Sequence, residues 1–244
     1  MKPIIALGLV LLSLFACKPA EIAINPALQA EAMPVKGRNG LQIGQIIRYG
    51  EYQTDKVRRG WTKSYDVPFL LRFRGAKEKL SYTQFGPNGL QAEVACVSKF
   101  KSVELPLLRD YFSIPLDLDN FFAGNIAFGD GESNWDFLLH NPNGDFLRKE
   151  ASAGFVQSAA GKRFEIVAVR GLKGQPDWMK ELAVYGHEFH LDGRVVAAVS
   201  TVNKGTVWID PELDGELKTV VAAVATGLLL RTGVEETAVD SLDS

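Results

Sequence analysis

Short β-rich segments separated by turn signals dominate the pattern of hydrophobic and polar positions along the chain. Four turns lie between such segments: 86–89 between 80–85 and 90–98, 141–144 between 135–140 and 145–149, 192–193 between 185–191 and 194–201, and 203–205 between 202 and 206–210. These turns contain Asn-Gly, Asp-Gly or Asn-Lys-Gly, and such residues tolerate the positive φ angles of tight hairpins. Residues 41–52 and 69–73 are two further strand candidates. The pattern predicts an antiparallel all-β domain.

One segment near the C-terminus has a different pattern and predicts a helix. Residues 214–231 begin with acidic residues and end with Arg231 in the last turn, and Gly233 follows; these are helix start and stop signals. Residues 220–230 carry no polar stripe, and a helix that is apolar all round must be enclosed on all sides. Because eleven apolar or small residues are too few to span a bilayer, we expect a curved sheet to wrap around this helix.

The N-terminus has the pattern of a bacterial secretion signal. Lys2 supplies a positive charge, residues 4–12 form an apolar run, and small residues precede Cys17. The sequence Leu14-Phe15-Ala16-Cys17 resembles the lipobox, although Phe15 stands where a small residue is usual. The resemblance implies that residues 1–16 are removed and that Cys17 receives a diacylglyceryl thioether. An ordinary secretory signal with an unrelated cysteine is the alternative.

These signals divide the chain into four parts. We expect a lipoprotein signal peptide at 1–16, a lipidated tether with three prolines at 17–34, a single β-rich domain at 35–233, and an acidic, disordered tail at 234–244. The resemblance to lipoproteins implies a lipid-anchored protein of the bacterial cell envelope. Lys18 rather than Asp after the cysteine resembles outer-membrane sorting in diderm bacteria.

Charge and cysteine content narrow the classes of partner. The chain has 27 Lys and Arg against 29 Asp and Glu, a net charge of −2, which becomes −3 when Lys2 leaves with the signal peptide. This balance gives no overall attraction to nucleic acid. There are two cysteines. If Cys17 carries lipid, Cys96 has no disulfide partner in the chain, and its apolar neighbours predict a small buried side chain.

The C-terminal third resembles the tubby C-terminal and phospholipid-scramblase superfamily. Residues 189–200 contain a strand with an Asp-Gly turn, residues 205–211 form a strand that ends in an acidic turn, and 217–230 form the hydrophobic helix. The resemblance implies an antiparallel β-barrel that encloses this helix. A β-sandwich with a packed C-terminal helix is the alternative fold. Members of the superfamily are mostly non-enzymatic and several contact lipids, but no ligand-binding residue can be transferred to this chain.

The residues do not form a known catalytic or metal-binding motif. His187 and His190 are three positions apart, whereas the zinc-protease motif needs four, and on a strand they point to opposite faces. Residues 130–136 place oxygen-bearing side chains at alternate positions but lack the calcium-loop pattern. The sequence therefore predicts no catalytic residues, no metal and no cofactor.

Basic residues alternate with aromatic residues between positions 55 and 79. Such a stretch can contact phosphate-bearing partners or an anionic membrane surface, although alternating solvent-facing strand positions would give the same pattern. The candidate contact residues are Arg58, Arg59, Lys63, Arg72 and Arg74.

Three hypotheses about function follow. The first is a non-enzymatic, membrane-tethered binding or scaffolding lipoprotein that contacts anionic lipid or an envelope protein. The second is a hydrolase whose site is assembled from distant residues such as His140, His187 and His190. The third is a carbohydrate-binding β-sandwich that exposes Trp61, Trp135 or Trp178.

Overall fold

The fold is described from a computed structural model. It describes residues 20–38, 43–60, 73–74, 78–98, 101–102, 121–129, 133–140, 152–176 and 183–231. The predicted signal peptide, Cys17 and the acidic tail lie outside these residues.

Twelve strands follow one another around a single antiparallel sheet in the order β1-β15-β14-β13-β12-β11-β10-β9-β7-β6-β3-β2, and β4 also pairs with β6. Two further strands, β5 and β8, pair separately. The strands are β1 (Met33–Pro34), β2 (Arg48–Tyr49), β3 (Tyr52–Thr54), β4 (Arg58–Arg59), β5 (Phe73–Arg74), β6 (Glu78–Phe85), β7 (Gln91–Ser98), β8 (Lys101–Ser102), β9 (Phe121–Phe128), β10 (Asn134–His140), β11 (Ser152–Ser158), β12 (Arg163–Val169), β13 (Gly186–Leu191), β14 (Arg194–Ser200) and β15 (Thr206–Ile209).

The two ends of this sheet meet, so the sheet forms a nearly closed barrel. Just after β1, the Lys36 backbone nitrogen donates to the Arg48 carbonyl of β2 at 2.8 Å, and the Arg48 nitrogen donates back at 3.0 Å. Closure leaves few unpaired backbone groups at the sheet edges. The predicted antiparallel barrel is therefore confirmed, and the alternative β-sandwich is wrong.

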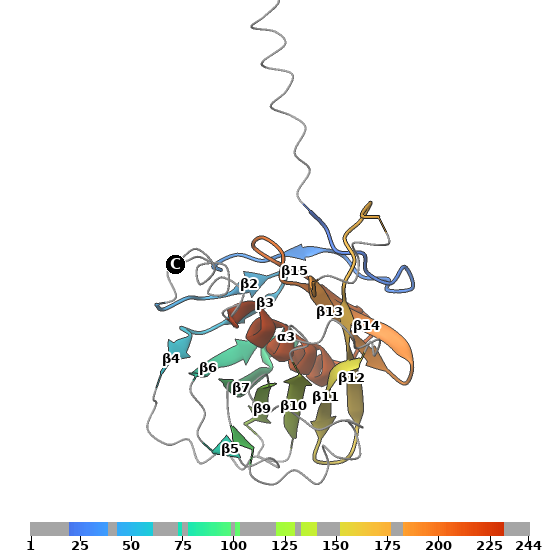
Figure 1. Ribbon diagram of the computed structural model, residues 1–244. Helices are drawn as coiled ribbons and strands as arrows, with labels where there is room; N and C mark the ends of the chain where they lie inside the picture. The colour runs from blue at the N-terminus through green and yellow to red at the C-terminus, as the bar shows by residue number, and fades with distance from the viewer. Residues whose placement is uncertain are drawn as a thin grey trace, which may run out of the picture.

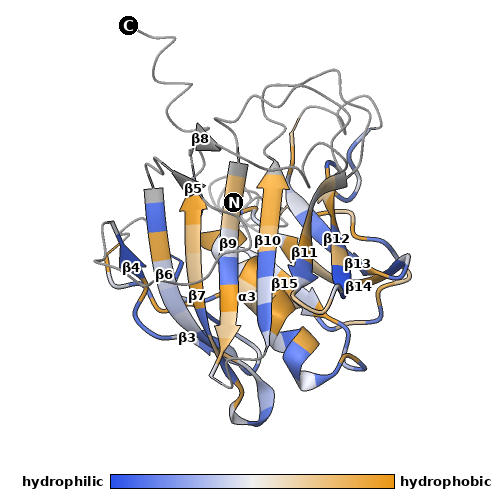
Figure 2. Cartoon of the chain, turned by 90° about the horizontal axis from the view of Figure 1, so that it is seen from below, coloured by the Kyte–Doolittle hydropathy of each residue, from blue (hydrophilic) through white to orange (hydrophobic). Residues whose placement is uncertain are grey.

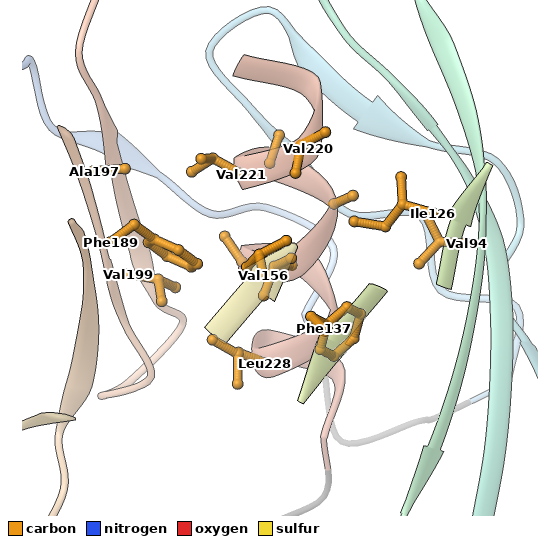
Figure 3. Close-up of a cluster of buried hydrophobic side chains, with 14 of the residues drawn as sticks. Val94, Ile126, Phe137, Val156, Phe189, Ala197, Val199, Val220, Val221 and Leu228 are labelled. Atoms are coloured by element: carbon orange, nitrogen blue, oxygen red, sulfur yellow. The ribbon is translucent and has the colours of Figure 1, made fainter. Parts of the chain in front are cut away.

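The hydrophobic C-terminal helix α3 (Gly215–Leu230) lies inside the barrel (Figure 1). Its bounds agree with the prediction, and the Asp214 carboxylate caps it by accepting from the Leu217 backbone nitrogen at 2.7 Å. Residues on every side of the helix are buried. Figure 3 shows Val220, Val221 and Leu228 of α3 among side chains from strands around the barrel, including Phe189 of β13 and Ile126 of β9. The helix is thus the centre of the core.

Hydrogen bonds also tie α3 to the barrel wall. The Tyr49 hydroxyl donates to the Ala222 carbonyl at 2.8 Å, and the Tyr82 hydroxyl donates to the Ala223 carbonyl at 2.6 Å. Thr226, in the following turn, donates to Gln84 at 2.8 Å. Because unpaired buried polar groups are costly, these bonds allow two tyrosines and a glutamine to lie in an apolar interior.

The hairpin signals have the expected backbone at the turns that the structure describes. Asp192 and Gly193, between β13 and β14, have φ angles of 51° and 77°. Asn88 and Gly89, between β6 and β7, have φ angles of 57° and 75°, and Pro87–Gly89 forms the short helix η2. Residues 141–149 lie outside the described part of the chain.

Candidate functional site

Arg58 is the predicted basic residue that the structure presents most clearly to solvent. It lies on β4, which pairs with the first half of β6 through Arg58 and Ser81. Its side chain is 45% exposed, and its Nη2 atom is 3.3 Å from Asp55 Oδ2. Exposed ion pairs of this kind contribute little to stability, so Arg58 can exchange this partner for another anion.

Arg59 points toward the barrel interior. Its Nη2 atom donates to the Leu230 carbonyl at 2.8 Å and to Gln45 Oε1 at 3.2 Å. Leu230 is the last residue of α3, where the helix dipole favours a cation. Arg59 therefore has a structural partner that the sequence pattern did not indicate, namely the helix terminus.

The other predicted basic residues are described less fully. Lys63 and Arg72 lie outside the described residues, as do Trp61, Tyr65 and Phe69. Arg74 lies on β5, and the register places it opposite Lys101 of β8.

Sequence reasoning missed Ile43, which is 91% exposed. The neighbouring Gly44 is covered by the aliphatic part of the Lys56 side chain, and the Val57 backbone nitrogen donates to the Gln45 carbonyl at 2.9 Å. The exposed isoleucine is thus next in the chain to a glycine that Lys56 packs on, and Arg58 follows Val57, which pairs with Gln45. We name Ile43, Lys56 and Arg58 the Ile43 edge. Ile43 belongs to the strand candidate at 41–52, and nothing in this segment of the sequence indicated its exposure.

The Ile43 edge lies near the end of the barrel at which α3 finishes. Arg59, the residue after Arg58, donates to the Leu230 carbonyl, and Gln45 accepts a hydrogen bond from the same guanidinium. The strands β7 and β10 also finish at this end, which is at the top of Figure 2. We name it the helix-exit end.

The described part of the expected tether, residues 20–34, lies along the barrel and buries a few of its side chains. Residues 17–34 were predicted to be a lipidated tether ahead of the domain, but Ile22 is 1% exposed, Leu28 is 7% exposed, and Met33–Pro34 forms β1. The folded domain therefore begins well before residue 35. The predicted domain start at residue 35 was wrong because three prolines indicate an extended chain, and such a chain can also lie along a sheet when its few apolar side chains pack on it.

We name residues 21–30 the strap, because they cross the outer face of β13 and β14. At the helix-exit end, the Ala23 backbone nitrogen donates to Gly171, which follows β12, at 2.8 Å. In the middle of β13, the Asn25 backbone nitrogen donates to the buried Glu188 carboxylate at 2.6 Å. Beyond it, Leu28 packs on Val195 and Ala198 of β14. The strap is therefore fixed at three successive points.

The two histidines of β13 lie on opposite faces of the strand, as predicted. His190 Nε2 is 3.1 Å from Glu188 Oε2 under the strap. His187 lies on the side of α3, where burial, followed by the nearby charges of Arg231 and Arg170, lowers its pKa to about 3. His140 ends β10, which β11 and β12 separate from β13. This arrangement does not bring His187 and His190 into one catalytic site.

Other candidate residues are parts of the core. Cys96 is a buried thiol, and burial raises its pKa well above the ordinary value, partly offset by a hydrogen bond with Tyr82. Trp135 is 2% exposed and its Nε1 atom donates to Glu216 at 2.8 Å, so it cannot stack on a sugar. Asp136, at the end of the oxygen-rich loop, is buried and accepts from Asn125 at 2.7 Å. Residues 130–132, Trp61 and Trp178 lie outside the described part.

No group of three or more His, Cys, Asp or Glu side chains in the described part of the chain is placed to hold a metal ion. Among the helices described, none combines the length and the apolar character needed to cross a membrane.

Comparison with known proteins found no matching family model, no matching curated protein and no matching solved structure. The resemblance to the tubby and scramblase superfamily stays a prediction.

Proposed function

We propose that this chain is a lipid-anchored, non-enzymatic binding protein of the bacterial cell envelope, and that its Ile43 edge contacts an anionic lipid surface. The anchor is the lipid on Cys17, and Lys18 favours the outer membrane in a diderm organism. The observation that carries the contact is the exposed Ile43, whose neighbour Gly44 contacts Lys56, together with the exposed Arg58 two residues after Lys56. Interfacial residues commonly combine an apolar group that enters the headgroup layer with cations that stay in it.

The expected energies fit a contact that assists an anchor. Each cation near an anionic surface contributes about 1 kcal/mol, and full burial of an isoleucine contributes about 1.5–3 kcal/mol. Their sum is small compared with the free energy of stable membrane anchoring, which requires more than one lipid chain or a chain plus a basic patch. The edge would therefore hold an already anchored barrel against the membrane.

Vesicle co-sedimentation tests the contact. The chain from Lys18 onward, without its lipid, is mixed with phosphatidylcholine vesicles that contain or lack phosphatidylglycerol. We expect binding to the anionic vesicles that weakens about 30-fold in the double variant Lys56→Gln, Arg58→Gln, because two contributions of about 1 kcal/mol are lost. Ile43→Ser should weaken binding to the same vesicles as well.

A matched control comes from the opposite end of the barrel. Lys162 is an exposed lysine whose Nζ atom is 4.0 Å from Asp214 at the start of α3, so Lys162→Gln removes a charge but should leave binding unchanged. Equal sedimentation with charged and neutral vesicles would overturn the contact, and so would equal losses in the Lys162 variant.

The anchor needs its own test. Expression of the full chain in a bacterium should give a product that lacks residues 1–16, carries the mass of a lipid on Cys17 and sediments with membranes. A Cys17→Ser variant should show neither the added mass nor the membrane fraction. An unmodified wild-type Cys17 would refute the lipoprotein assignment.

A further inference from the structure

The strap brings the proposed lipid attachment point close to one end of the barrel. Ala20, the first described residue, comes directly before the strap, whose Ile22 pairs with Leu172 at the helix-exit end. Three peptide units separate Cys17 from Ala20, and an extended chain covers at most about 3.6 Å per residue. The Cα atom of Cys17, the attachment point of the lipid, can therefore lie no more than about 11 Å from the Cα atom of Ala20.

We propose that the strap is an orientation device, which turns the helix-exit end of the barrel toward the membrane. This inference rests on the proposed lipidation of Cys17. If residues 17–32 were a free linker, the root-mean-square distance between its ends would be about 22 Å, and the barrel could turn either end to the bilayer. With the strap in place, rotation about so short a connection would drive the wall of the barrel into the headgroups.

Three contacts along its length hold the strap. At its start, Lys173 pairs with Glu21 at 2.7 Å and its backbone nitrogen donates to the Glu21 carbonyl. The buried carboxylate of Glu188 accepts from Asn25 and also contacts His190. Leu28 provides the apolar contact. Because these contacts lie just after β12, on β13 and on β14, the strap cannot shift along the barrel without losing all of them.

The orientation is independent of lipid charge. The strap acts through covalent distance, so it should operate on a neutral bilayer, whereas the Ile43 edge requires anionic lipid. The two nevertheless agree, since both place the helix-exit end at the membrane.

Two label positions distinguish the ends of the barrel. Lys204 lies in the turn between β14 and β15, next to Gly205, which packs directly against Leu229 in the last turn of α3. Lys162 lies beside Asp214 at the start of the helix. The sixteen residues of α3 separate these positions by about 24 Å along the helix axis. Cys96 should not react with the label, because it is buried and the pKa of its thiol is raised.

The experiment measures energy transfer from a dye at Lys204→Cys or Lys162→Cys to acceptors on the headgroups of a phosphatidylcholine bilayer. The full, lipidated protein is used. We expect the Lys204 dye to lie nearer the bilayer by roughly the 24 Å that separates the two positions. Equal energy transfer from the two dye positions, in protein that remains anchored, would overturn the proposed orientation. The proposed lipoprotein function would still stand. Failure of lipidation would appear differently, as protein that does not remain with the vesicles.

Two variants release the orientation by different routes. Leu28→Asp should undock the strap, and twelve Gly and Ser residues inserted between Pro19 and Ala20 should lengthen the connection while the strap stays docked. Both should make the transfer from the two dyes nearly equal. If the insertion variant kept the full difference in energy transfer between the two dyes, the short connection would not cause the orientation. The proposal would then fail, whether or not Leu28→Asp folds.

Discussion

Helix α3 and the strap both pack on β13 and β14, from opposite sides of the same strands. Inside, α3 is apolar on every face and touches strands around the whole barrel. Outside, the strap is a single extended layer that buries a few side chains and exposes the rest. The comparison indicates that buried apolar side chains of the same kind have two different effects in α3 and in the strap. The apolar side chains of α3 stabilise the folded barrel as a whole. Those of the strap fix the position of the residues that precede it.

The largest effect is expected from a charge inside the barrel. Val224 is fully buried in the middle of α3, so Val224→Asp places an unpaired carboxylate where no water can solvate it. A loss of more than about 4 kcal/mol is expected, enough to unfold many domains of ordinary stability. Urea unfolding followed by circular dichroism measures it. A similar change in the strap, Leu28→Asp, should leave the barrel folded. Equal losses of unfolding free energy in the two variants would contradict the different effects expected of α3 and the strap.

The inner histidine of β13 predicts a pH dependence. Because the pKa of His187 is lowered to about 3, the folded protein keeps this side chain neutral, while the unfolded chain takes up a proton below about pH 6.5. The free energy of unfolding should therefore fall as pH drops from 6.5 toward 3, by up to about 1.4 kcal/mol per pH unit from this group.

The matching experiment compares urea unfolding at pH 6.5 and at pH 4.5 in the wild type and in His187→Leu. The variant should lose part of the pH dependence, because leucine does not titrate. Tyr82→Phe serves as the control, since tyrosine does not titrate in this range. A dependence that is unchanged in His187→Leu would contradict the buried, neutral state.

A smaller effect tests the polar ties of the helix. Tyr82→Phe removes the hydroxyl that donates to Ala223, and the lost hydrogen bond should cost about 1 kcal/mol. Tyr49→Phe removes the donor to Ala222 in the same way. Urea midpoints measure both variants. A midpoint equal to the wild type would mean that packing alone positions α3.

The smallest effect on global stability is expected at the strap. A buried leucine truncated to alanine usually costs about 2–5 kcal/mol, but a segment that can open locally limits the loss to its own docking energy. Leu28→Ala should therefore change the free energy of unfolding of the barrel by about 1 kcal/mol or less. Limited proteolysis should show the real consequence, faster cleavage within residues 21–30. Unchanged cleavage would indicate that Leu28 does not hold the strap.

The sequence predicted the parts of the fold that have strong local signals. The helix was found because its caps and its uniform apolar surface leave few alternatives, and the turns at Asp192 and Asn88 were found because their residues tolerate positive φ. The hairpin of β11 and β12 was missed, since its turn contains one glycine, Gly161, and no Asn-Gly or Asp-Gly pair. β1 was missed because a strand of two residues with a proline has no periodicity.

The candidate site was less predictable, because it depends on contacts between distant residues. Arg58 and Arg59 look alike in sequence, yet one faces solvent and the other meets the end of α3, 171 residues away in the chain. Ile43 lies in a segment expected to be a strand, yet its side chain is 91% exposed. The strap depends on contacts with β13 and β14, which no local pattern near residues 21–30 describes.

The position of α3 has a consequence for the order of folding. The strands of the barrel precede the helix in the chain, so a nascent polypeptide presents them before the segment that fills their centre has been made. Until then the inward-facing side chains have nothing to pack on, and the exposed apolar surface is prone to aggregation. Completion of the barrel must therefore wait for a C-terminal segment, and a chain that stops before Gly215 would depend on holding chaperones to stay in solution.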